Sequence, residues 1–261
     1  MTGTVARPYA LAMLPEIVVV SPTLEPVSRD AIAALQDRIG AELPQGYAQL
    51  VGTLGEGTFC NEFNVFSPTR ILEQVDKARE AWAQYWFWDE DVVTQAEMAG
   101  AFRMGDSSNG DELAFVPDRG LVLLPRDDEQ VRTAGSSYID ALTSFCTSGD
   151  LVDPSGILWF QSWAQQSCYE NWSGGDLETV RRALAGLGLH VAEDHDPERR
   201  TSTFLVPAIG GHVRVAALAG SDLYVHLRYV PEESATADEV AGALEAAGST
   251  RTSRWGAERV G

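Results

Sequence analysis

The chain has 261 residues, which is long for one average domain and sufficient for two. Its 38 acidic and 19 basic side chains give a formal net charge of −19, and the first 150 residues carry 23 of the acids and 10 of the bases. This charge disfavours nucleic acid and anionic membranes as partners and favours a basic protein, although an acidic surface that only maintains solubility is the simpler interpretation of charge alone.

Cysteine spacing and hydropathy indicate a soluble, cytoplasmic protein. Cys60, Cys146 and Cys168 show no CxxC spacing, which argues against a disulfide framework or a thiolate zinc site, so we expect buried thiols. No apolar stretch approaches the roughly 20 residues of a membrane-spanning helix. The N-terminal segment lacks the pattern of a signal peptide.

The first elements are predicted from capping and periodicity. Residues 1–27 are rich in proline, which indicates a mostly irregular arm, and the strand-like run at 17–20 suits one edge strand within it. Ser28 is a suitable N-cap for a helix that ends at Gly40. Pro44 suits the first turn of a second helix, which presents Tyr47, Leu50, Val51 and Leu54 on one side.

Alternating and helical patterns continue to about residue 150. We expect a strand at 63–66, a long helix at 69–86, strands at 102–104, 113–117 and 120–124, and a helix at 137–146. The long helix carries an aromatic stripe that is typical of a core, with an interface anchor as the alternative. Turn-forming residues at 149–156 mark a domain boundary, so the predicted domains are 28–150 and 151–261.

The stretch from residue 28 to 148 resembles the SUKH superfamily, which includes fungal cell-wall synthesis regulators and bacterial immunity proteins. The resemblance rests on a helix ending in Ile-Gly, a following Leu-Pro with an aromatic residue three positions on, and a short helix running into a glycine turn and a strand. The matching positions are Ile39, Gly40, Leu43, Pro44, Tyr47, Leu50, Gly55, Gly57 and Phe59. The segment 104–116 is similar to the family's glycine-containing acidic loop. The resemblance implies an α+β domain with an antiparallel sheet and packed helices.

The second domain is predicted to be a small α+β fold. We expect residues 157–172 to form a helix, Asp176 to cap another, and a last helix to span 237–247. Strands at 203–209, 213–218 and 223–230 alternate as an antiparallel three-stranded meander with turns at Gly210 and near Gly220. Its core face would contain Phe204, Val206, Ala208, Val213, Val215, Ala217, Leu223, Val225 and Leu227.

The same register predicts a polar group on the other face of that sheet: His212, Arg214, Tyr224, His226 and Arg228. Histidine, tyrosine and arginine on one surface suit anion binding or acid–base chemistry. The outer face of a sheet covered on one side is polar in any case, so we interpret the group as a solvated face.

No motif points to catalysis. One loop contains Asp106, Asn109, Asp111 and Glu112. It lacks the spacing of a calcium-binding EF-hand, so we interpret it as a turn. His190 and His195 match no common metal spacing, and no nucleophile elbow, P-loop or dinucleotide fingerprint occurs. We expect no enzyme activity, no metal and no cofactor.

The hypothesis that follows is a binding protein. As the resemblance implies for bacterial members, the role would be immunity: an acidic surface masks the active site of a basic toxin domain, such as a nuclease or deaminase. The predicted partner-binding residues are Trp86, Trp88, Asp89, Glu90, Asp91, Asp106, Asp111, Glu112, Asp127, Asp128 and Glu129. A regulatory scaffold remains an alternative, as does a small-ligand sensor or enzyme with a site between the domains near Trp159, Trp163 and His212.

Overall fold

The computed structural model describes residues 17–217 and 223–259. The chain divides into two compact units: the first contains Glu25–Leu158, and the second combines Val18–Leu24 with Trp159–Gly261. Both are α+β, as the sequence predicted. The sequence places residues 1–27 in a separate arm, whereas Val18–Leu24 is part of the second unit and residues 1–16 lie outside the described residues.

Two capped helices open the first unit. Helix α1 (Arg29–Ile39) begins after Ser28, whose hydroxyl accepts a hydrogen bond from the Ala31 amide at 3.2 Å, and it ends at Gly40 with φ 72°. Helix α2 (Tyr47–Leu54) begins later than predicted from Pro44. The reason is that Gln45 forms an isolated parallel bridge with Ser137, which holds the preceding backbone in an extended conformation.

The sheet of the first unit is antiparallel throughout, with the strand order β2-β3-β4-β5-β6-β7. Its strands are β2 (Gly57–Phe59), β3 (Phe63–Val65), β4 (Phe102–Ser107), β5 (Glu112–Val116), β6 (Gly120–Leu124) and β7 (Arg132–Gly135). The predicted meander corresponds to β4, β5 and β6. Strand β7 carries no buried side chain and was not predicted from the apolar pattern.

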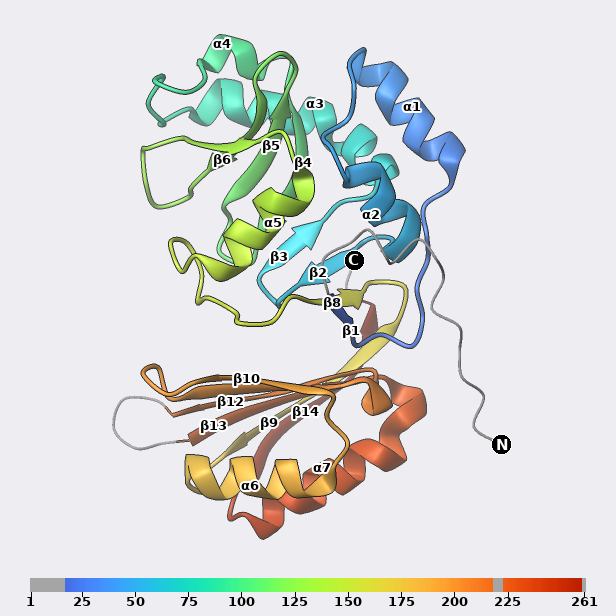
Figure 1. Ribbon diagram of the computed structural model, residues 1–261, viewed down its shortest axis with the longest axis vertical. Helices are drawn as coiled ribbons and strands as arrows, with labels where there is room; N and C mark the ends of the chain where they lie inside the picture. Colours follow the sequence, from blue (N-terminus) through green and yellow to red (C-terminus); the bar gives the residue numbers. More distant parts are fainter. Residues whose placement is uncertain (1–16, 218–222, 260–261) are drawn as a thin grey trace. The chain divides into compact units, whose positions relative to one another are not determined.

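Helices lie on both faces of this sheet (Figure 1). Helix α3 (Pro68–Tyr85) and the short α4 (Gln95–Met98), which was not predicted, pack with Ala114 and Val122 in one core cluster. Leu113 and Leu123 are offset by one residue from those positions, so they face the opposite side, where α5 (Tyr138–Thr147) lies. The sheet therefore has a second apolar face beneath α5.

The segment predicted as a helix at 157–172 is two strands, so that prediction was wrong. Strand β8 (Trp159–Ser162) pairs in parallel with β1 (Val18–Val19), and β9 (Gln166–Ser173) joins the large sheet of the second unit. Aromatic and apolar residues suit a buried strand as well as a helix over a run of this length, so composition alone did not separate the two.

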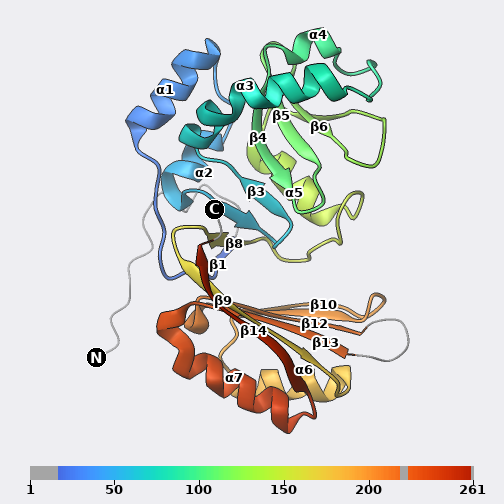
Figure 2. The ribbon, with the colours of Figure 1, turned by 180° about the vertical axis from the view of Figure 1, so that it is seen from behind.

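The large sheet of the second unit has six strands rather than the predicted three, in the order β10-β11-β12-β13-β9-β14. The strands are β10 (Ala192–Asp196), β11 (Thr201–Val206), β12 (Gly211–Ala217), β13 (Leu223–Tyr229), β9 and β14 (Thr250–Arg259). Helices α6 (Leu177–Leu187) and α7 (Ser234–Ala246) cover one face of it (Figure 2). The predicted cap of α6 is confirmed: Asp176 accepts a hydrogen bond from the Thr179 amide at 3.0 Å.

The core face of this sheet agrees with the predicted register, with one correction. Phe204 lies opposite Val213, and Val215 lies opposite Val225. Ala208 is exposed, because the chain leaves the strand at Val206 for a short 3-10 turn over Pro207–Ile209. The predicted turn near Gly220 lies outside the described residues.

Candidate partner-binding surface and apolar pocket

Two acidic segments that are distant in the sequence meet on the first unit. One follows α3 and contains Asp89, and the other connects β6 with β7 and contains Glu129. The Asp89 amide donates to the Glu129 carbonyl at 2.8 Å, and the Val131 amide donates to the Asp89 carboxylate at 3.3 Å. We call the resulting region the acidic surface: Asp89, Glu90, Asp91, Asp127, Asp128 and Glu129.

Most carboxylates of the acidic surface face solvent. Asp91, Asp127 and Glu129 are exposed, and Glu90, also exposed, accepts a hydrogen bond from the Gln95 amide at 3.1 Å. The Gln130 amide and the Arg132 guanidinium both donate to Asp128, and these interactions hold the pKa of its carboxyl below its usual value. These two donors therefore favour the ionised form of Asp128.

The two tryptophans predicted as interface anchors make most of their contacts within the first unit. Trp86 and Trp88 stack edge-to-face at 5.2 Å and pack against the α3 core cluster, and Trp88 Nε1 donates to the Pro125 carbonyl at 2.6 Å. Their neighbours Tyr85 and Phe87 are the exposed aromatic side chains, at 67% and 46%. Exposed aromatic area next to the acidic surface thus comes from residues that the sequence reasoning did not select.

Three further predicted residues do not join the acidic surface. Asp106 accepts a hydrogen bond from Asn64 at 2.8 Å, and burial raises the pKa of its carboxyl. Asp111 is buried and accepts hydrogen bonds from the Ser107 hydroxyl and the Arg126 amide. Glu112 accepts from Trp82 Nε1 at 2.7 Å and pairs with Arg103. All three carboxylates hold the first unit together from within.

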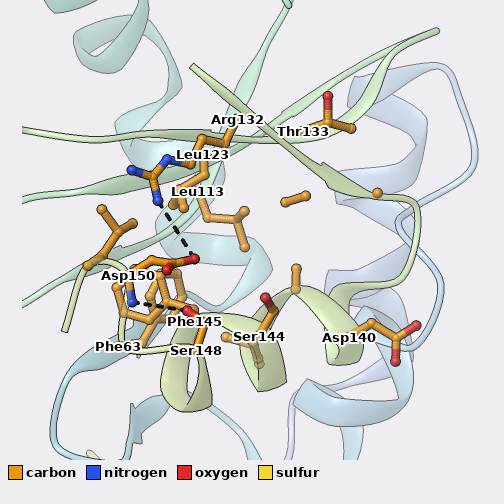
Figure 3. Close-up of a pocket in the computed structure, with 15 residues that line it drawn as sticks. Phe63, Leu113, Leu123, Arg132, Thr133, Asp140, Ser144, Phe145, Ser148 and Asp150 are labelled. Atoms are coloured by element: carbon orange, nitrogen blue, oxygen red, sulfur yellow. Dashed lines mark hydrogen bonds and ion pairs between the residues drawn. The ribbon is translucent and has the colours of Figure 1, made fainter. Parts of the chain in front are cut away.

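An apolar pocket lies between α5 and the sheet of the first unit (Figure 3). Leu113 and Leu123 extend from the sheet toward the helix, while Phe63 and Phe145 meet edge-to-face at 4.8 Å at one end. The cavity has a volume of about 490 Å³, which lies within the range of small-ligand sites. Sequence patterning missed it because β7, which forms one wall, lacks an apolar pattern.

Charged groups gather at the mouth of this pocket. The Arg132 guanidinium pairs with Asp128 at 3.1 Å and lies 4.0 Å from Asp150, whose side chain is 67% exposed. Arg132, Asp150 and Leu151 also line a second, smaller cavity of about 230 Å³, together with Asp111, Asp127 and Asp128. The apolar pocket therefore adjoins the acidic surface.

The polar face of the second unit differs from the solvated face that was predicted. His212 is fully buried and its ring lies 4.7 Å from that of Trp159, and Arg228 is only 4% exposed. Arg228 Nε donates to the Ser167 hydroxyl at 3.2 Å. The shared face was predicted correctly, since His212 pairs with Arg228 and Arg214 with His226. Its burial was not, because the strand that carries Trp159 was taken for a helix.

Asn171 links two side chains at the exposed end of the polar face of the second unit. Its side-chain oxygen accepts hydrogen bonds from the Tyr224 hydroxyl at 2.5 Å and from His226 Nδ1 at 3.0 Å. Burial, followed by the nearby Arg228 and Arg214, lowers the pKa of His226 to about 4. Burial and the same cations also lower the pKa of His212. Both imidazoles are therefore neutral at physiological pH.

Within residues 17–217 and 223–259, no group of three or more histidine, cysteine, aspartate or glutamate side chains could hold a metal ion. The acidic loop at 106–112 is a turn in which Ser107 bonds to Asp111, as its composition indicates. The three cysteines are buried thiols. No helix in the described part of the chain is long and apolar enough to span a bilayer.

No protein-family model matches the chain, and no curated protein is significantly similar to it.

Proposed function

We propose that this chain is a binding protein whose acidic surface docks onto a basic partner protein. The observation that carries the proposal is the pair of hydrogen bonds that fixes Asp89 beside Glu129 and Val131: the Asp89 amide donates to the Glu129 carbonyl, and the Asp89 carboxylate accepts from the Val131 amide. Those bonds convert two separate acidic segments into one surface with exposed carboxylates on both sides. Exposed aromatic area at Tyr85 and Phe87 precedes it in the chain and suits an interface.

The role we propose for this binding is immunity, in which the acidic surface occupies the cleft of a toxin that acts on nucleic acid. Such a cleft is basic because it must hold phosphates, so a row of fixed carboxylates competes for the same groups. The resemblance of residues 28–148 to the SUKH superfamily supports this role. The first 150 residues carry 23 acids and 10 bases, so their net charge is −13 of the chain's −19, which agrees with it. The protein would inhibit by blocking access and would perform no chemistry itself.

The test is affinity capture of the tagged full chain from the cells that produce it, in about 50 mM and about 500 mM salt. We expect a stoichiometric basic protein that is retained at low salt and released at high salt, because screening weakens exposed charge pairs. Its toxicity should fall when the two proteins are produced together. Retention of neutral proteins alone, or no loss of toxicity, would contradict the immunity proposal.

A charge-neutralised chain adds a control to the capture. The variant Asp91→Asn/Asp127→Asn/Glu129→Gln removes three exposed charges from the acidic surface. The matched variant Asp238→Asn/Glu239→Gln/Glu245→Gln removes three exposed charges from α7 in the second unit and leaves the same net charge. We expect only the first variant to lose the partner. Equal loss in both would mean that net charge, rather than the acidic surface, retains it.

A further inference from the structure

The apolar pocket and the acidic surface meet at one side chain. Arg132 lines the pocket, pairs with Asp128 of the acidic surface and lies beside Asp150. Asp127 and Asp128 line the smaller cavity that shares the same edge. A ligand in the apolar pocket would therefore emerge directly against carboxylates.

The interior of the pocket favours apolar groups. Its deep walls are formed by the leucine and phenylalanine side chains of β3, β5, β6 and α5, while the hydroxyls of Ser144 and Ser148 lie along the helix edge. A chain that inserts an aromatic or branched aliphatic side chain here removes apolar surface from water on both sides of the contact. A charged group placed among the leucine and phenylalanine side chains would lose its hydration.

The mouth favours cations. Among the described residues, Arg132 is the one base that lines these cavities, whereas Asp111, Asp127, Asp128, Asp140 and Asp150 each line at least one of them. Asp111 is committed to hydrogen bonds within the unit, and Arg132 offsets part of the charge of Asp128. Asp127 and the largely exposed Asp150 keep acceptor positions that a lysine or arginine can reach from outside.

We propose that the pocket between α5 and β7 receives one apolar side chain of the partner protein, with arginine or lysine residues flanking it in the partner sequence. The apolar side chain is the anchor of the complex, and the flanking bases contact Asp127 and Asp150. This inference rests on the proposed function and gives the basic partner a recognition element: a phenylalanine or leucine within a basic segment. Several carboxylates surround the apolar pocket, and a peptide segment with several bases can contact more of them than a small amine with a single charge can.

The experiment uses three capped pentapeptides with the isotope-labelled full-length chain in about 50 mM salt. The sequences are Arg-Arg-Phe-Arg-Arg, Arg-Arg-Ala-Arg-Arg and Glu-Glu-Phe-Glu-Glu, and binding is followed by amide chemical shifts. We expect the first peptide to shift amides of β7 and α5, the second to bind at least about tenfold more weakly, and the third not to bind.

A pocket-filling variant separates the pocket from general electrostatic attraction. Ser144→Phe places a ring at the edge of the cavity, and Thr147→Phe places the same ring at an exposed position on α5 that does not line it. We expect Ser144→Phe to reduce binding of the phenylalanine peptide to the level of the alanine peptide, and Thr147→Phe to leave it unchanged. Amide spectra of both variants in the absence of peptide verify that they fold.

The outcomes separate this inference from the proposed function. Equal binding of the phenylalanine and alanine peptides, or unchanged binding to Ser144→Phe, overturns the anchor pocket even where a basic partner is captured in a salt-dependent way. Pocket-dependent peptide binding upholds the anchor pocket even where the captured partner is no toxin, and only the immunity role is then abandoned.

Discussion

His226 is the side chain through which acid should most directly affect the second unit. Its imidazole donates to Asn171, it is flanked by Arg214 and Arg228, and its pKa lies at about 4. An unfolded histidine has a pKa of about 6.5, so the unfolded chain takes up the proton first as the pH falls. The contribution of His226 to the free energy of unfolding is therefore fully present above about pH 6.5. It decreases as the pH falls from there to about 4.

We therefore predict that the free energy of unfolding falls by about 2 kcal/mol between pH 6.5 and pH 5 because of His226. The lowered pKa of His212 also makes the free energy of unfolding fall as the pH falls. Urea denaturation at several pH values measures the change, and His226→Gln should reduce the slope. A histidine titration by NMR that placed the pKa of His226 near 6.5 would contradict this account.

Two buried tyrosines fix the position of α5, and α5 forms one wall of the apolar pocket. Tyr138 at the start of the helix donates to the Met104 carbonyl at 3.0 Å, and Tyr47 of α2 donates to the Phe66 carbonyl at 2.8 Å. The two rings meet edge-to-face at 5.1 Å. Helix α5 is thereby tied both to the sheet and to α2.

Removing the Tyr138 hydroxyl should cost about 1 kcal/mol of stability, the usual contribution of one buried hydrogen bond. Tyr138→Phe keeps the ring contacts, so the first unit should unfold at lower urea concentration while the pocket still binds the phenylalanine peptide. Tyr85→Phe, at an exposed position, is the control and should change stability by no more than a few tenths of a kcal/mol. Equal effects in the two variants would show that the Tyr138 hydroxyl does not hold α5 in place.

Elements with a local signal could be predicted from the sequence, and elements held by distant residues could not. The caps at Ser28 and Asp176 and the alternation of β11, β12 and β13 are local, and they were predicted with nearly correct boundaries. Strand β9 was missed because Glu170 breaks its apolar alternation. That buried carboxylate is accommodated by Arg251 and Arg254 of β14, far along the chain.

The candidate site also combines features that the sequence shows locally with features that depend on distant residues. The acidic segments at 89–91 and 127–129 are visible in the sequence, but their meeting depends on hydrogen bonds between loops about 40 residues apart. The burial of Asp111 depends on Ser107 and on the Arg126 amide, neither of which a count of charges reveals. Charge identified the region, and only the tertiary structure separated its exposed carboxylates from its structural ones.

The distribution of charge over the whole molecule favours association through the first unit. The first 150 residues carry 23 acids and 10 bases, a net charge of −13 out of −19, and several of these acids lie together on the two adjoining loops of the acidic surface. A field of this kind accelerates encounter with a basic partner at low salt, and it is screened beyond about 8 Å at physiological ionic strength. Affinity that survives high salt would come from the apolar pocket and the exposed aromatic side chains.

The most direct test of this account is the association rate of the captured partner, measured against ionic strength for the wild-type chain, Asp91→Asn/Asp127→Asn/Glu129→Gln and the matched α7 variant. We predict that the acidic-surface variant associates about tenfold more slowly at low salt and with a weaker salt dependence, while the α7 variant matches the wild type. If the acidic-surface variant associated as fast as the wild type, with the same salt dependence, the acidic surface would not be the docking site.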